Sequence, residues 1–145
     1  MNTEGKKYWI LTTEFPPFHG GGISTYCYHT TRMFSERGYN VSVFIFDKNV
    51  SKTTIEVITN NLKTIRFALP VKNVSKYLSE QGKINYRFLE VILEFINKEG
   101  KPDFIESQDY LGLAYYILLA KHTLNPLLAN TQIIITLHTP AFVYL

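Results

Sequence analysis

The stretch YWILTTEFPPFHGGGI, residues 8–23, decides the fold. Its first part, residues 8–13, is a run of aromatic and β-branched side chains that predicts a buried strand, and the proline pair that follows predicts a loop. Three consecutive glycines, Gly20–Gly22, lead directly into apolar residues at helical spacing, which continue until Gly38. Residues 39–46 (YNVSVFIF) predict a second strand. The first 47 residues therefore form a βαβ unit, whose strands we expect to be parallel.

The remainder of the chain continues this alternation of strands and helices. The patterns predict a hairpin or strand pair at a sheet edge over residues 55–69, helices over 77–98 and 113–124, and strands over 103–107 and 132–137. This order is typical of an α/β domain with a Rossmann-like, doubly wound and mostly parallel sheet. We expect one domain over residues 1–145.

Composition excludes several classes of protein. The 145 residues include 15 Lys and Arg against 12 Asp and Glu, a formal net charge of +3 that is too mild to indicate a nucleic-acid binder. The longest apolar stretch spans about ten residues, well short of the ~20 that a membrane-spanning helix requires. The N-terminus lacks the apolar core of a signal peptide, so we expect a cytoplasmic location. Cys27 is the single cysteine, which excludes an internal disulfide and suggests a small buried side chain.

Basic residues gather in one part of the sequence. Between Asn60 and Arg87 the single acid is Glu80, and the basic residues are Lys63, Arg66, Lys72, Lys76, Lys83 and Arg87. These side chains are either ordinary solvated faces or a surface that attracts an anionic acceptor or an anionic membrane. The second reading predicts a peripheral contact with the inner face of a membrane.

The glycine-rich loop is the first candidate site. Ligands of an open parallel sheet bind outside the carboxyl ends of its strands, where this loop is expected to lie. Gly20, Gly21 and Gly22 let the backbone approach a ligand closely, and the N–H groups at a helix start favour phosphate oxygens. The alternative is a loop that needs glycine only for its backbone angles.

Two further segments follow predicted strands. The polar segment Glu106–Tyr110, with Gln108, Asp109 and Tyr110 at its end, could bind a sugar, although Asp109 could equally cap a helix. His138 follows the last strand and is the candidate catalytic residue, and His19 beside the glycines is a weaker candidate for ligand contact. The four histidines show no paired metal-ligand spacing, so we expect no metal.

A dinucleotide site is an alternative interpretation of the same loop. Gly20-x-Gly22-x-x-Thr25 imitates the G-x-G-x-x-G fingerprint, and Asp47 ends the second strand, where an acid could hold a ribose. Thr25 replaces the third glycine, however, and a long loop stands where the fingerprint has a tight turn. No Gly-Lys-Ser/Thr sequence follows, which disfavours a P-loop.

Four motifs in order resemble retaining family-4 glycosyltransferases of the GT-B fold. They are the proline pair with the glycine loop, the segment ERGYNVSV (36–43) that resembles "RGHxVxV", the segment PDFIE (102–106) that resembles "PDxIxxH", and the segment TLHT (136–139) that resembles "xxTxHxx". Two departures are Tyr39 and Gln108, which stand where members of the family often carry histidine.

The resemblance implies a function for each candidate. The chain would be the N-terminal, acceptor-side half of an enzyme that moves a hexose from a nucleotide sugar to a hydroxyl acceptor, saccharide or lipid-linked, with retention and without a metal or cofactor. Gly20, Gly21 and Gly22 would approach the donor diphosphate, His138 would lie near the transferred sugar, and His19, Gln108, Asp109 and Tyr110 would contact acceptor or sugar. The C-terminal nucleotide-sugar domain would be absent, so this half alone would be inactive. A nucleotide-binding domain of another enzyme and a noncatalytic interaction module remain alternatives.

Overall fold

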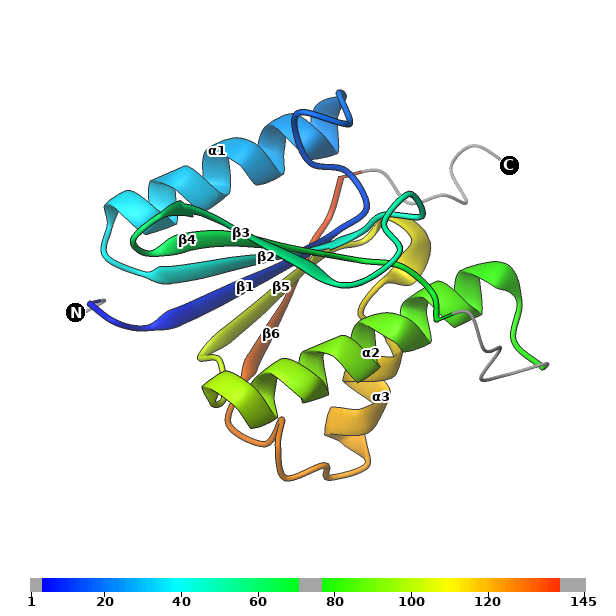
Figure 1. Ribbon diagram of the computed structural model, residues 1–145. Helices are drawn as coiled ribbons and strands as arrows, with labels where there is room; N and C mark the ends of the chain where they lie inside the picture. Colours follow the sequence, from blue (N-terminus) through cyan, green and yellow to red (C-terminus); the bar gives the residue numbers. More distant parts are fainter. Residues whose placement is uncertain (1–3, 71–76, 139–145) are drawn as a thin grey trace.

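The computed structural model describes residues 4–70 and 77–138. Their strands form one sheet in the order β3-β4-β2-β1-β5-β6 (Figure 1). The elements in chain order are β1 (Lys7–Thr12), α1 (Gly22–Glu36), β2 (Asn40–Phe46), β3 (Thr54–Thr59), β4 (Leu62–Phe67), α2 (Glu80–Glu99), β5 (Phe104–Gln108), the 3-10 turn η1 (Tyr110–Gly112), α3 (Tyr115–His122) and β6 (Gln132–Thr136).

The sheet is parallel except at one edge. β1 pairs in parallel with β2 and with β5, β2 with β4, and β5 with β6, whereas β3 runs antiparallel to β4. The predicted edge hairpin is thus confirmed as β3 and β4, joined at Asn60 and Asn61. The expected Rossmann-like, doubly wound and mostly parallel sheet is also confirmed.

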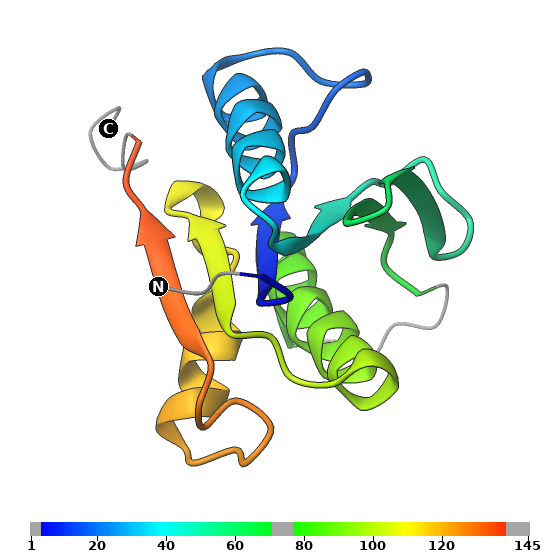
Figure 2. The ribbon, with the colours of Figure 1, turned by 90° about the vertical axis from the view of Figure 1, so that its left-hand side faces the viewer.

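The strand order reverses direction at β1. The chain first builds outward from β1 to β2 and β4, and then returns to the other side of β1 for β5 and β6. Since β-α-β crossovers are right-handed, this reversal places the helices before and after it on opposite faces. Figure 2 shows α1 on one face and α2 and α3 on the other.

Each face of the sheet has its own apolar core, because successive side chains of a strand point to opposite faces. On β1, Tyr8 and Ile10 pack toward α1 with Cys27, whereas Trp9 and Leu11 pack toward α2 and α3. Burial raises the pKa of the Cys27 thiol to about 12, so this cysteine behaves as a small hydrophobic residue.

Two helices begin later than the sequence pattern predicted. α2 begins at Glu80 because the Ser79 side chain caps it by accepting a hydrogen bond from the backbone N–H of Gly82 at 3.0 Å. α3 begins at Tyr115, after the 3-10 turn Tyr110–Gly112 and the non-helical backbone of Ala114, and Leu111 within that turn has a left-handed φ of 62°.

The packing of α2 leads to a stability prediction. Phe88 is fully buried in the core between α2 and the sheet, so Phe88→Ala should lower the free energy of unfolding by about 3–5 kcal/mol. Urea unfolding followed by the fluorescence of the single tryptophan, Trp9, measures this change. The control Tyr77→Ala removes a ring that is 97% exposed and should change stability by less than about 0.5 kcal/mol. Equal midpoints for the two variants would contradict this packing.

Candidate functional site

The segments singled out in the sequence converge at one edge of the sheet. β1, β5 and β6 are neighbours that run in parallel, so their carboxyl ends lie side by side. The strand order reverses between β1 and β5, and in open α/β sheets such a point is where ligands bind. The glycine-rich loop follows β1, Gln108 ends β5, and His138 follows β6.

The glycine loop opens α1 as predicted. Gly21 is the residue before the helix and has φ of 128°, a conformation that side chains disfavour. A Cβ atom on Gly20 or Gly22 would meet nothing within 4 Å, which leaves open space beside the loop. On Gly21 it would lie 3.5 Å from Oε2 of Glu14, so an acidic side chain lies close to the helix start. An anion that binds at the helix start must therefore share this space with Glu14.

His138 is held from two sides. Its Nε2 atom contacts Oε1 of Gln108, and its backbone N–H donates to Oδ1 of Asp109 at 3.1 Å. The ring of Tyr26 meets the imidazole edge-on, with 5.0 Å between the ring centroids. Asp109 stands at the N-cap position of the turn η1, but its side chain makes no capping hydrogen bond there. Three of the predicted site residues, Gln108, Asp109 and His138, thus lie together.

The other predicted residues border this cluster. Tyr110 is 37% exposed in the turn after β5, and His19 is exposed in the glycine loop, where its carbonyl accepts a hydrogen bond from Oγ of Ser24 at 2.6 Å. Among the residues that the structure describes, no hydrogen bond or ring contact joins either side chain to His138.

A buried carboxylate, that of Glu106, underlies the cluster. It accepts hydrogen bonds from the hydroxyls of Tyr8 at 2.7 Å, Tyr26 at 2.8 Å and Thr136 at 2.6 Å. Burial and the bond to Glu106 raise the pKa of Tyr8 and of Tyr26, so both phenols stay protonated and continue to donate. Because Tyr26 also contacts His138, the carboxylate fixes one wall of the imidazole site.

Sequence reasoning missed this network. Glu106 belongs to a polar segment that was expected to face a sugar, but the structure buries its side chain to 1% exposure beneath the site. The sequence signal that could have indicated the network is an acid inside the short strand FIESQ. A carboxylate buried in a strand requires several hydrogen-bond donors around it.

Two polar atoms of the cluster lack partners. Nε2 of Gln108 and Oδ2 of Asp109 are buried and form no hydrogen bond to the described residues. One is a donor and the other an acceptor, which is the combination that a sugar hydroxyl group satisfies.

The turn after β5 is strained and held from α2. The carbonyl of Leu111, the residue with left-handed backbone, accepts hydrogen bonds from Nδ2 of Asn85 at 3.0 Å and from Nε2 of Gln81 at 3.4 Å. Such strain persists only where neighbouring groups enforce it, and it concentrates at functional sites. These two α2 side chains therefore help to fix the position of Asp109 and Tyr110.

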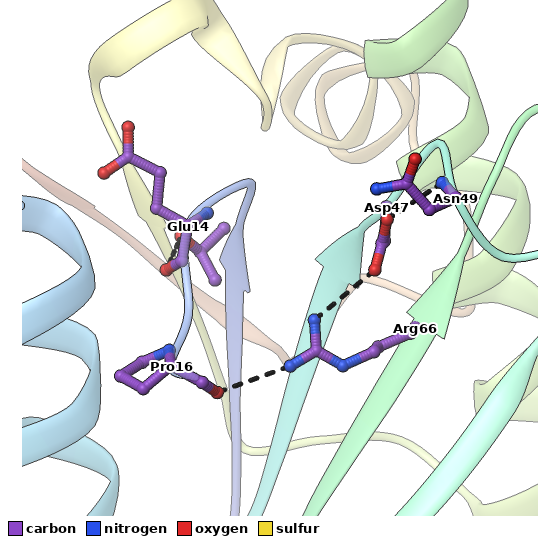
Figure 3. Close-up of polar contacts among 6 residues, drawn as sticks. Glu14, Pro16, Asp47, Asn49 and Arg66 are labelled. Atoms are coloured by element: carbon purple, nitrogen blue, oxygen red, sulfur yellow. Dashed lines mark hydrogen bonds and ion pairs between the residues drawn. The ribbon is translucent and has the colours of Figure 1, made fainter. Parts of the chain in front are cut away.

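Asp47 is not free to hold a ribose. It is 7% exposed, and its Oδ2 atom lies 3.7 Å from Nη1 of the buried Arg66 (Figure 3). The acid that a dinucleotide site requires is thus already engaged.

The positive charge of the basic residues between Asn60 and Arg87 is partly neutralised by acidic partners. Lys63, Lys83 and Arg87 form ion pairs with Glu99, Glu80 and Glu90, and Arg66 is buried. Lys72 and Lys76 lie outside the described residues, so membrane contact stays a prediction.

Residues 4–70 and 77–138 contain neither a cluster of metal ligands nor a membrane-spanning helix. No group of three or more His, Cys, Asp or Glu side chains could hold a metal ion there. No helix in these ranges is long and apolar enough to cross a bilayer.

Solved structures share this fold. Sucrose-phosphate synthase from Thermosynechococcus elongatus superposes with a TM-score of 0.72 and 14% identity, covering 96% of this chain and 34% of that one. The catalytic domain of starch synthase IV from Arabidopsis thaliana, bound to ADP and acarbose, gives 0.61 and 13% over 94% of this chain and 34% of its own. A trehalose-6-phosphate protein from E. coli, bound with UDP-2-fluoro glucose, gives 0.53 and 13% over 93% and 33%.

These neighbours are GT-B glycosyltransferases, and the sheet described above is a Rossmann-like half of that fold. The chain spans about a third of the length of each of them. No curated protein sequence matches the chain significantly. The family model described as Glycosyltransferase Family 4 matches residues 20–145, from the glycine loop onward. Because this match covers most of the sequence and agrees with the fold, the chain belongs to glycosyltransferase family 4.

Proposed function

We propose that the chain is the acceptor-side half of an enzyme that transfers a hexose from a nucleotide sugar to a hydroxyl acceptor with retention of configuration. The observation that carries the proposal is the pair of unpartnered polar atoms, Nε2 of Gln108 and Oδ2 of Asp109, beside His138. A donor and an acceptor on residues that both contact His138 are the groups that a sugar hydroxyl can satisfy. They lie on the opposite side of the strand reversal from the glycine loop.

The glycine loop supports the donor side of the proposal. The backbone N–H groups at the start of α1 and the positive end of its dipole favour a diphosphate, the leaving group of a nucleotide sugar. Two of the similar proteins were solved with ADP and with UDP-2-fluoro glucose, which agrees with a donor of this class. These backbone N–H groups would stabilise the negative charge of the departing diphosphate without a metal. A cleft that excludes water would strengthen the attraction between the N–H groups and the diphosphate.

The remaining parts of the reaction need a second domain. Residues that neutralise the nucleotide diphosphate and bind its base would come from a C-terminal half. We therefore propose that the 145 residues alone do not turn over.

The two other functional classes have less support. The engagement of Asp47 by Arg66 removes the acid that a dinucleotide-binding domain would use for the ribose. A noncatalytic interaction module would not require unpartnered polar atoms beside a histidine at the strand reversal.

Substitutions of Gly21 and Gly22 distinguish an effect on folding stability from an effect on ligand binding. In the 145-residue chain, Gly21→Ala should cost about 1–3 kcal/mol of folding stability, because φ of 128° strains any side chain. Gly22→Ala meets open space at an ordinary φ and should leave stability unchanged or slightly higher. In the complete gene product, the added methyl at Gly22 should still weaken nucleotide-sugar binding by calorimetry, because the backbone approaches the diphosphate there. Unchanged affinity in a stable Gly22→Ala protein would exclude this contact.

Substitution of His138 tests whether this residue contacts the transferred sugar. His138→Ala in the complete gene product should reduce kcat/KM for transfer about 10- to 100-fold, the loss of one or two hydrogen bonds to a hydroxyl. The matched control is His122→Ala, an exposed histidine in the last turn of α3, which should leave kcat/KM unchanged. If both variants behaved like the wild type, His138 would not contact the transferred sugar.

Peripheral membrane contact remains a separate proposal. It predicts that the protein floats with vesicles rich in anionic lipid at low salt and not at high salt, because screening removes surface attraction. Failure to float at low salt would refute it.

A further inference from the structure

A buried guanidinium crosses the carboxyl edge of the sheet beside the glycine loop. Arg66 lies near the end of β4 and is 7% exposed. Its side chain extends between the end of β2 and the loop after β1 (Figure 3). There Nη2 donates to the carbonyl of Pro16 at 3.4 Å, and Nη1 lies 3.7 Å from Oδ2 of Asp47.

The acidic partner of Arg66 is itself fixed. Oδ1 of Asp47 accepts a hydrogen bond from the backbone N–H of Asn49 at 2.9 Å, in the turn that follows β2. This bond orients the carboxylate toward the guanidinium. The carboxylate balances the charge of the guanidinium, whose Nε and Nη1 atoms are buried and form no hydrogen bond to the described residues. Nη2, which faces the loop, is the nitrogen that forms a hydrogen bond.

The same guanidinium also contacts an aromatic ring of the loop. Cζ of Arg66 lies 4.6 Å from the centroid of the Phe18 ring, which is 67% exposed. Cation–π attraction therefore keeps an otherwise solvated ring against the sheet. Arg66 thus holds residues 16 and 18, and the glycines begin two residues later.

The other anchors of the loop lie toward its ends. Phe15 is buried in the core under α1, and Ser24 binds the carbonyl of His19. Among the described residues, Arg66 forms the only side-chain hydrogen bond to residues 16–18. The middle of the loop therefore depends on this side chain.

We propose that Arg66 is a positioning residue that holds Gly20–Gly22 in the conformation that binds the diphosphate of the nucleotide sugar. The inference rests on the function proposed above and adds to it a residue on β4, two strands away from β1. A loop that is ordered before binding avoids the affinity lost when the competent conformation is only partly populated.

The test compares two substitutions on the same strand. Arg66→Met keeps an unbranched apolar stem and removes the guanidinium. Lys63→Met removes a cation that is paired with Glu99 at the other end of β4. In the complete gene product, Arg66→Met should raise the Kd and KM for the nucleotide sugar about tenfold, as expected if the competent loop is populated one-tenth of the time, with little change in kcat. Lys63→Met should leave both values unchanged.

A second readout does not depend on activity. In the 145-residue chain, NMR order parameters of the Gly20–Gly22 amides should fall in Arg66→Met toward about 0.6, the range of flexible backbone, and stay unchanged in Lys63→Met. If Arg66→Met does not fold, Phe18→Ala replaces it, because that exposed ring can be removed without leaving a buried charge. It should loosen the glycines and raise the Kd in the same direction.

The outcomes separate this inference from the proposed function. A complete wild-type protein that binds no nucleotide sugar would overturn the proposed function. Wild-type binding together with unchanged affinity and unchanged order parameters in Arg66→Met and Phe18→Ala would overturn the role of Arg66 alone. A loss confined to kcat would also overturn it, because a positioning role predicts a change in KM.

Discussion

The carboxylate of Glu106 joins four elements of the fold at one point. Its partners come from β1, α1 and β6, and it is itself carried by β5. A carboxylate buried in this way is tolerated only while its hydrogen bonds are made, so each partner must stay in place. The bonds link the two strands beside the strand reversal to the helix that follows the glycine loop. The relative placement of the glycine loop and His138 therefore depends on the three hydrogen bonds of this buried carboxylate.

The edge of the sheet is organised by two polar groups with different roles. Glu106 supports the side formed by β5 and β6, where Gln108 and His138 meet. Arg66 supports the side formed by β1, β2 and β4, where the glycine loop begins. Each is buried, and each acts on residues that lie nearer to the solvent. Rigid support beneath exposed contact groups is what precise binding requires, since a loosely held group loses affinity and rate.

Sequence patterns could predict the elements because each is encoded locally. The alternating strands, the glycine-led helix α1 and the hairpin are all visible within windows of a few residues, and adjacent elements fix the βαβ order. The starts of α2 and α3 were misplaced because a serine cap and the 3-10 turn that contains the left-handed Leu111 override periodicity. The clustering of Gln108 and His138 followed from the rule for strand ends. The network beneath them could not be found in this way, because Tyr8 and Tyr26 lie 98 and 80 residues from Glu106 in sequence.

The two edges of the sheet differ in how they meet solvent. β3 closes one edge with the fully exposed strand TIEVIT, which carries Glu56 and two threonines beside the exposed Ile55, Val57 and Ile58. β6 forms the other edge with the uncharged sequence QIIIT, in which Ile134 and Ile135 are 37% and 39% exposed. A short β-branched strand without charge or proline at a sheet edge offers unpaired backbone groups to other chains. Glu56 places a charge on β3, whereas β6 has none. A lysine introduced on the exposed side of β6 is therefore the first change to make when preparing the 145 residues at high concentration.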